Sequence, residues 1–314
     1  MSDISSTTIA VFRAMRPRQW IKNLALFAPI LLTGQLFNTQ LFAITFKSFL
    51  VFCMLSSANY LFNDVLDAPK DRKHPFKKWR PIASGKISIR LALGLSALLL
   101  IGGLLSSIHI NNSFFLMSVT FALLAYAYTL FLKQFAVVDI LVIAFAYFLR
   151  VYAGEAATGY HLSIWLSLAV FSLSLFLAIG KRRAELTLLQ NYHGATPRDT
   201  RSTLGHYSEK LLDTYTAMFA NSTWITYAFY AFLEKPPESK WRYREFLTDT
   251  IPADRKWLMI TIPIVLFGIM RYMQLIYEGK GESPEQILTS DIPLLTTIIV
   301  WGLFVIAIIY GIGG

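Results

Sequence analysis

The sequence predicts an all-α integral membrane protein of about nine transmembrane helices. Of its 314 residues, 55% are hydrophobic and only 15% are charged, whereas a soluble domain carries roughly a quarter charged residues. A soluble protein of this length could not bury so much apolar surface. We expect one transmembrane domain over residues 1–314. Its apolar stretches, each about the 20 residues needed to cross a bilayer, lie at 20–37, 41–62, 89–108, 113–132, 137–156, 162–180, 212–233, 257–277 and 292–312.

The charged residues and the cysteine count exclude two other classes of protein. The formal net charge is +10, and in a soluble protein such a surplus would indicate a nucleic-acid partner. Here the basic residues cluster between apolar stretches, where membrane topology and anionic substrates explain them better. The single cysteine, Cys53, excludes a secreted disulfide scaffold. We therefore expect the bilayer as a partner and no nucleic acid.

Lysine and arginine also predict the orientation, because loops rich in them stay in the cytoplasm. The N-terminal arm and the polar segments at about 63–88 and 181–211 are basic, while the connections near Asn38 and Asn111 carry no Lys or Arg. The N-terminus and both polar segments should therefore face the cytoplasm, and the first stretch, which lacks a cleavage site, should be retained. The loop at 234–256 conflicts with this scheme, because it carries six Lys or Arg and yet falls outside.

The second apolar stretch ends in three acids and one amide. Helical continuation would place Asn63, Asp67 and Asp71 on one face at steps of four, with Asp64 beside them. Carboxylates on one face repel one another unless a cation lies between them. An all-oxygen ligand set selects Mg²⁺, held together with substrate phosphates. Pro69 leaves an alternative open, because a kink there would put Asp71 on a separate segment.

Basic residues follow these acids directly. Carboxylates and cations interleaved within about 20 residues suit a metal-bound polyphosphate, in which the acids hold the metal and Lys or Arg meet the remaining phosphate oxygens. The alternative is a solvated loop that obeys the positive-inside rule, which explains the cations but not the register of the acids. The residues of this segment that we single out are Arg72, His74, Pro75, Lys77, Arg80, Pro81 and Gly85.

The acidic cluster, Asn63-Asp64-x-x-Asp67-x-x-x-Asp71, resembles the first aspartate-rich motif of the UbiA superfamily of intramembrane prenyltransferases. The longer string through His74 and Arg80 is similar to the branch of that superfamily that contains decaprenyl-phosphate phosphoribosyltransferase. The similarity spans nearly the whole chain and is densest before residue 210. Its other segments are Arg16-Pro17-x-Gln19-Trp20-x-Lys22-Asn23, Tyr128-Thr129-x-x-Leu132-Lys133, Gly180-Lys181-Arg182-Arg183-Ala184-Glu185-Leu186, Tyr215-Thr216, Arg271-Tyr272 and Ser290-Asp291.

The resemblance implies a fold, a cofactor and a reaction. It implies transmembrane helices around a central cavity that faces the cytoplasm, Mg²⁺ as cofactor, and assembly as a homotrimer. The implied reaction moves 5-phosphoribose from phosphoribosyl diphosphate (PRPP) to a polyprenyl monophosphate such as decaprenyl phosphate, with release of diphosphate. The attacking lipid phosphate is already anionic, so the reaction needs positioning and charge screening more than a strong general base.

The segment after the sixth stretch differs from a second aspartate-rich motif. It reads Lys181-Arg182-Arg183-Ala184-Glu185, with three cations and one acid. A second acidic motif would help to chelate metal on a prenyl diphosphate, whereas cations bind a bare phosphate directly, which favours a lipid monophosphate as acceptor. Two alternatives stay open, because the cations could simply obey the positive-inside rule and Glu185 could pair with Lys181.

Arg150 is an ionisable residue inside the fifth stretch, so it should face the protein interior and have a partner. Either Glu155, five residues on, is that partner, or Arg150 meets a substrate phosphate. Asp139, near the start of the same stretch, is either a cavity acid or a helix cap. Tyr128 and Lys133 should lie at the same pocket, although Tyr128 could equally be an interfacial aromatic residue.

The predicted site therefore has catalytic acids, metal ligands and substrate-binding residues. The catalytic residues are Asp64, Asp67 and Asp71, and the metal ligands are these three and Asn63. The histidines show no metal-ligand spacing and receive no metal role. The substrate-binding residues are Lys22, Tyr60, Arg72, Lys77, Arg80, Tyr128, Lys133, Arg150, Lys181, Arg182 and Glu185.

Three other functions compete with this one. An aromatic prenyltransferase of the same superfamily would consume a prenyl diphosphate and an aromatic acceptor, without PRPP. A small-anion transporter would use polar clusters at broken helices and form no covalent product. A membrane scaffold would leave the register of the aspartates unexplained.

Overall fold

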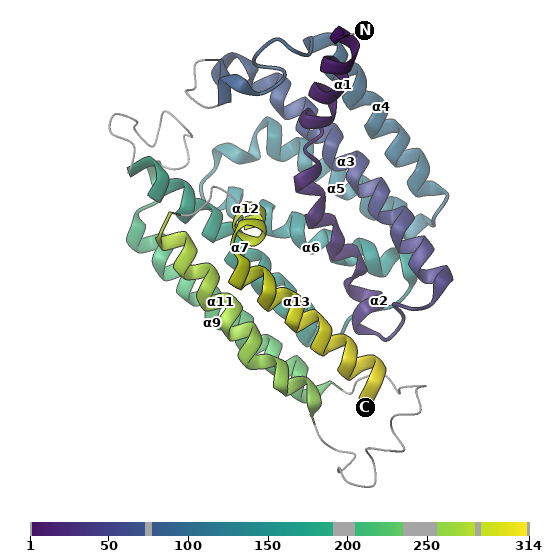
Figure 1. The fold of residues 1–314 in the computed structure, drawn as a ribbon, viewed down its shortest axis with the longest axis vertical. Helices are drawn as coiled ribbons and strands as arrows, with labels where there is room; N and C mark the ends of the chain where they lie inside the picture. The colour runs from purple at the N-terminus through teal and green to yellow at the C-terminus, as the bar shows by residue number, and fades with distance from the viewer. Residues whose placement is uncertain (1, 73–76, 191–204, 235–255, 280–283, 313–314) are drawn as a thin grey trace. The chain divides into compact units, whose positions relative to one another are not determined.

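Only helices and turns occur in the part of the chain that the structure describes, which confirms the predicted all-α class (Figure 1). Seven helices within these residues are long and apolar enough to cross a membrane. Two of the nine predicted stretches are not among them, so the count of nine is not confirmed. The residues described by the computed structural model are 2–72, 77–190, 205–234, 256–279 and 284–312.

The first predicted stretch, 20–37, is not one apolar α-helix. It consists of a 3₁₀ helix, η1 (Pro17–Phe27), and a short α-helix, α2 (Ala28–Leu32). Pro29 lies in the first turn of α2, where a missing backbone N–H is tolerated, so the proline favours a new helix starting at this junction. Gly34 then adopts a left-handed φ of 75°, which ends the segment.

The predicted stretch at 212–233 does form a long helix, α9 (Glu209–Leu233). This helix is not one of the seven membrane-crossing candidates. Its sequence interrupts the apolar residues with Asp213, Asn221 and Ser222. These polar side chains lower the apolarity of the helix without shortening it.

The chain divides into two compact units, each assembled from separate segments. Helices α3 (Thr39–Asp71) and α6 (Val138–Thr158) each contribute residues to both units. Unit 1 comprises residues 1–26, 43–131 and 149–159, and unit 2 comprises residues 27–42, 132–148 and 160–314.

Unit 1 contains most of α3, together with α1 (Ser2–Ala14), η1, η2 (Lys77–Trp79), α4 (Ile89–Ile108) and α5 (Asn112–Leu130). Phe52 of α3 packs against Phe114 and Phe121 of α5, with ring centroids 5.8 and 4.8 Å apart. A second apolar cluster joins α1, the end of α3 and the segment before α4. The Ser88 and Asn111 side chains cap α4 and α5, since each accepts a hydrogen bond from a backbone N–H of the first turn.

Unit 2 contains η3 (Leu132–Gln134), α7 (Ile164–Gln190), α9, η5 (Trp257–Thr261), α11 (Ile262–Tyr277), α12 (Pro284–Ser290), α13 (Ile292–Ile306) and a terminal π-helical turn, η6 (Ala307–Ile312). Helix α9 packs along α7 and against α11 (Figure 1). Gly180 permits a close approach of α7 to α11, because a Cβ there would lie 2.7 Å from Ile276. Helix α7 runs beyond its predicted end at residue 180, so the cationic segment is helical.

Candidate functional site

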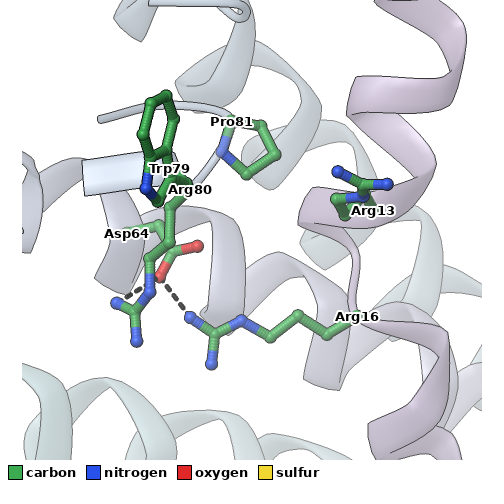
Figure 2. Close-up of a pocket in the computed structure, with 6 residues that line it drawn as sticks. All are labelled: Arg13, Arg16, Asp64, Trp79, Arg80 and Pro81. Carbon is green, nitrogen blue, oxygen red and sulfur yellow. Dashed lines mark hydrogen bonds and ion pairs between the residues drawn. The ribbon is translucent and has the colours of Figure 1, made fainter. Parts of the chain in front are cut away.

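The carboxyl end of α3 carries two buried carboxylates, those of Asp64 and Asp71, that pair with arginines. Figure 2 shows Asp64 with Arg16 and Arg80. The Asp64 Oδ1 atom lies 2.5 Å from Arg16 Nη2 and 3.3 Å from Arg80 Nη1. The same Arg80 nitrogen lies 2.8 Å from Asp71 Oδ2. The side chains of Asp64 and Asp71 are only 3% and 7% exposed, whereas both arginine side chains are 28% exposed. The guanidinium groups therefore stand between the carboxylates and the solvent.

All four residues of the acidic motif belong to one helix. Pro69 lies inside α3, and the helix nevertheless continues to Asp71, so the alternative of a separate segment for Asp71 is wrong. Asn63 donates from Nδ2 to Asp67 Oδ2 over 2.9 Å, which shows the predicted spacing of one helical turn. Asn63 and Asp67 are partly exposed. The motif thus splits into a covered pair, Asp64 and Asp71, and a more accessible pair.

A pocket of about 290 Å³ opens beside Asp64, one member of the covered pair. Three arginines and one carboxylate line it, so its wall carries a net positive charge. In Figure 2 the guanidinium groups of Arg16 and Arg80 approach the Asp64 carboxylate from different segments. The lining residues are Arg13, Arg16, Asp64, Trp79, Arg80 and Pro81.

The backbone at Arg16 is strained. Its φ of 55° lies in the left-handed region, which costs roughly 1–3 kcal/mol for a residue other than glycine. Hydrogen bonds on both sides hold the turn, from Arg16 N to Arg13 O and from Gln19 N to Arg16 O. Trp20 anchors the next turn by donating to Ser57 Oγ on α3 over 3.0 Å. The Arg16 guanidinium also lies 5.1 Å from the ring centroid of Tyr60.

The donor set of the motif suits a hard divalent cation, because three carboxylates and one amide offer only oxygen ligands. Among the described residues, no group of three or more His, Cys, Asp or Glu side chains stands close enough together to hold a metal ion. Arg16 and Arg80 instead neutralise Asp64 and Asp71. The oxygen ligands of the motif are therefore of the kind that binds Mg²⁺. In this structure, however, arginine side chains pair with two of the three carboxylates.

Arg150 has a neutral partner in unit 1. Its Nε donates to Asn23 Oδ1 over 2.8 Å, and its guanidinium lies 4.7 Å from the ring centroid of Phe121. Asn23 is fully buried and also donates from Nδ2 to the Cys53 sulfur over 3.4 Å. Arg150 is 6% exposed, which agrees with the expectation that it faces the protein interior.

The cationic segment of unit 2 holds a buried network. Arg182 is fully buried, with its Nε 2.7 Å from Asp139 Oδ2 in an ion pair and its Nη1 2.6 Å from Glu185 Oε2. Tyr207 donates to the other Asp139 oxygen over 2.7 Å and accepts from the backbone N–H of Val137. Burial, and then this hydrogen bond to Asp139, raise the pKa of Tyr207 well above its usual range. Tyr207 therefore stays protonated and donating at physiological pH.

Arg182 and its neighbour Arg183 differ from the exposed cations that a phosphate site would need. Arg183 is 7% exposed and lies 2.7 Å from Asp213 on α9 and 3.3 Å from Glu209. Both arginines thus bind carboxylates within unit 2, and Asp139 is the buried partner of Arg182 rather than a helix cap. Lys181 is partly exposed on the same helix.

The remaining predicted residues fall into both units. In unit 1, Arg72 donates from Nε to the carbonyl of Ala83. His74 and Pro75 lie outside the described residues, as does most of the loop at 234–256. In unit 2, Lys133 lies on η3 and is partly exposed. The other predicted substrate-binding residues of unit 1 that are partly exposed are Lys22, Tyr60, Lys77 and Tyr128.

Sequence reasoning did not assign Arg16 to the site. The sequence places Arg16 among the basic residues of the N-terminal arm, although it opens the segment Arg16-Pro17-x-Gln19-Trp20 that carries part of the resemblance. That segment was the signal that could have assigned it. Trp79, which also lines the pocket, has no comparable signal. The pairing of Asp139 with Arg182 joins two helices, and no local spacing predicts it.

The UbiA prenyltransferase family model matches residues 24–194. The chain belongs to this family. It is 32% identical over 295 residues to the decaprenyl-phosphate phosphoribosyltransferase of Mycolicibacterium smegmatis, covering 93% of this chain and 89% of that protein. It is 33% identical over 295 residues to the enzyme of the same name from Mycobacterium tuberculosis strain H37Rv, covering 93% of this chain and 91% of that protein.

A solved structure supports the fold of this UbiA family member. It is a UbiA homolog from Archaeoglobus fulgidus bound to GPP and Mg²⁺, with a TM-score of 0.69 and 19% sequence identity. The match covers 96% of this chain and 99% of that chain. The chain is accordingly an integral membrane protein of a family in which a divalent metal has been seen bound.

Proposed function

We propose that this protein transfers 5-phosphoribose from PRPP to a polyprenyl monophosphate of the decaprenyl type. The ion pairs of Arg16 with Asp64, and of Arg80 with Asp64 and Asp71, carry the proposal, because acids and guanidinium groups at one helix end suit a metal-bound diphosphate. The phosphoribosyltransferase relatives, similar over most of the chain, support the choice of donor. The cations at 181–183 suggest a bare lipid phosphate, but Arg182 and Arg183 are buried against carboxylates, whereas Arg16 and Arg80 are 28% exposed. Lys181 is the remaining candidate there.

The donor is held at the end of α3. Asn63, Asp64, Asp67 and Asp71 are the residues that would hold Mg²⁺. The bound ion would neutralise the diphosphate as it leaves. Arg80 and Lys77 lie on the same segment of unit 1 and bind the remaining phosphate oxygens of PRPP. Lys133 stays a predicted phosphate contact.

The reaction exchanges one C–O bond for another. An oxygen of the lipid phosphate forms a bond to C1 of the ribose, and the bond between C1 and the diphosphate oxygen breaks, with its electron pair leaving on diphosphate. No proton has to move, because the acceptor oxygen is already anionic. The residues of the site therefore position two anions and screen their repulsion. Attack opposite the leaving group inverts C1.

We further propose that the acidic end of α3 faces the cytoplasm and that the protein forms a homotrimer. The orientation rests on the basic N-terminal arm and the basic residues after α3. The trimer rests on the resemblance. Light scattering of the purified protein, corrected for detergent, measures the assembly directly.

The deciding experiment incubates purified protein with radiolabelled PRPP and decaprenyl phosphate, with and without EDTA, and extracts the lipid. Label in the lipid phase that depends on both substrates and disappears with EDTA is the expected result. A parallel reaction supplies geranyl diphosphate and 4-hydroxybenzoate. Prenylation of the aromatic acid without label transfer from PRPP would replace the proposal by an aromatic prenyltransferase. Uptake of a small anion by proteoliposomes, without any covalent product, would replace it by a transporter.

A further inference from the structure

Asp64 is covered by a counter-ion that belongs to the protein itself. Its Oδ1 atom contacts two guanidinium groups, and the closer one belongs to Arg16, 48 positions away in the sequence. The Asp64 side chain is 3% exposed and that of Arg16 is 28% exposed. A cation that approaches Asp64 through the pocket therefore meets Arg16 and Arg80 first.

The charges of this cluster oppose the entry of a metal ion on its own. Asp64 and Asp71 carry two negative charges, and Arg16 and Arg80 carry two positive charges that lie within ion-pair distance of them. Arg13 adds a further positive charge to the pocket wall. A bare divalent cation would thus enter a site that is already neutralised, whereas a diphosphate would find a positively charged wall.

Arg16 also has a second contact. Its guanidinium lies 5.1 Å from the ring centroid of Tyr60, so it can leave Asp64 without losing every favourable interaction. The left-handed backbone at Arg16 and the hydrogen bonds around it hold the residue at the pocket. A diphosphate in the pocket would offer the released guanidinium a stronger anionic partner.

We propose that Arg16 is an internal counter-ion that competes with the divalent cation for Asp64, so that the metal is taken up together with a diphosphate. This role of Arg16 rests on the proposed metal-diphosphate site and makes Arg16 a direct ligand of the diphosphate. The ion pair with Asp64 keeps bare metal out, and the same guanidinium binds the incoming diphosphate. Metal and diphosphate binding are therefore positively coupled.

The test uses the full-length protein in detergent and measures two affinities. Mn²⁺ affinity without substrate is measured from the electron paramagnetic resonance of free Mn²⁺. Binding of ³²P-labelled inorganic diphosphate is measured at saturating Mn²⁺. For Arg16→Gln we expect Mn²⁺ to bind about tenfold more tightly and diphosphate about tenfold more weakly than in the wild type. The opposite signs matter, because simple loss of structure would weaken both.

Two further variants sharpen the test. Arg16→Lys keeps the positive charge and should retain most of the resistance to Mn²⁺. Arg13→Gln removes a charge from the same pocket, but Asp64 pairs with Arg16 and Arg80 and not with Arg13 among the described ion pairs. This variant should raise Mn²⁺ affinity by at most about twofold. An equal rise for Arg13→Gln and Arg16→Gln would overturn the specific pairing.

Failure of this inference is distinct from failure of the proposed function, because neither binding measurement needs a lipid acceptor or turnover. Wild-type Mn²⁺ affinity in Arg16→Gln, or a loss of both affinities, overturns the counter-ion role even if phosphoribosyl transfer is observed. The expected opposite changes, together with no transfer to lipid, uphold the counter-ion role and overturn the proposed reaction.

Discussion

Arg150 Nε donates a hydrogen bond to Asn23 Oδ1, 127 positions earlier in the chain. The contact joins α6 to the 3₁₀ helix η1 within unit 1, and both side chains are buried. Asn23 also contacts Cys53 on α3. One arginine and one amide therefore connect three helical segments of unit 1.

Replacing Arg150 by leucine should destabilise the protein. The substitution leaves Asn23 Oδ1 without this donor and removes the contact with Phe121, which together cost about 2 kcal/mol. We expect a lower midpoint of thermal unfolding in detergent, with the Michaelis constants of the remaining active protein unchanged. An unchanged midpoint with a raised Michaelis constant for either substrate would instead place Arg150 in contact with substrate.

Gly154 should tolerate no side chain. A Cβ at this position would lie 2.2 Å from the carbonyl oxygen of Leu26, so Gly154→Ala must move α6 away from η1, at a cost of about 2 kcal/mol or more. Gly94→Ala is the matched control, because no atom lies within 4 Å of its added Cβ and alanine favours the helix by about 1 kcal/mol. Thermal unfolding of the two variants should move in opposite directions. Equal midpoints would show that η1 can move away from α6 without loss of stability.

The metal role of Asp67 is tested by Asp67→Asn. The amide keeps the size of the side chain and can still bond to Asn63, while the negative charge is lost. We expect turnover to fall about 100-fold at fixed Mg²⁺ and the Mg²⁺ concentration for half-maximal rate to rise. Glu278→Gln, an exposed acid on unit 2, should leave both quantities unchanged. Wild-type turnover and metal dependence in Asp67→Asn would remove this residue from the scheme.

Asp139 should be essential for the stability of unit 2. Asp139→Asn leaves the fully buried Arg182 without its fully buried carboxylate partner, which costs about 3–5 kcal/mol. Glu209→Gln removes a carboxylate that is 47% exposed and lies 3.3 Å from Arg183, a loss of at most about 1 kcal/mol. Limited proteolysis and thermal unfolding should therefore separate the two variants clearly. Comparable stability would show that Glu185 alone suffices for Arg182.

The orientation can be measured with single cysteines, because the only native cysteine, Cys53, is buried. Ser84 and Ser113 are exposed and lie beyond opposite ends of α4. In intact cells, Ser113→Cys should react with a membrane-impermeant maleimide and Ser84→Cys should react only after permeabilisation. The reverse pattern would place the acidic end of α3 outside.

The sequence predicted the parts of the fold that depend on apolar length, and the local spacing within α3. The Asn63–Asp67 bond follows from the helical repeat alone. The 3₁₀ form of Pro17–Phe27 was not predicted, because its apolar residues do not reveal the backbone hydrogen-bond pattern. The close approach of Gly154 to Leu26 belongs to tertiary packing, which a single sequence does not encode locally.

The partners of the charged residues were the least predictable part of the site. Arg150 was expected to meet either Glu155 or a substrate phosphate, and its hydrogen bond to Asn23 was not considered. Arg182 was assigned to a substrate phosphate, yet it lies buried against Asp139 and Glu185. Asn23 and Asp139 belong to segments distant in the sequence from the arginines they contact. Glu185 lies one helical turn from Arg182. Charge and hydropathy alone cannot distinguish a cation that binds substrate from one that holds two helices together.

The length of α3 has a consequence for how two very different molecules meet. A helix of 33 residues is roughly 50 Å long, while the hydrocarbon core of a bilayer is only about 30 Å thick. The polar end of α3 is the part suited to lie outside the hydrocarbon core of the bilayer. It carries Asn63, Asp64, Asp67 and Asp71. The highly charged phosphoribosyl donor could then bind from the aqueous phase without entering the hydrocarbon core. The phosphate head group of the lipid could bind while it stays at the bilayer interface.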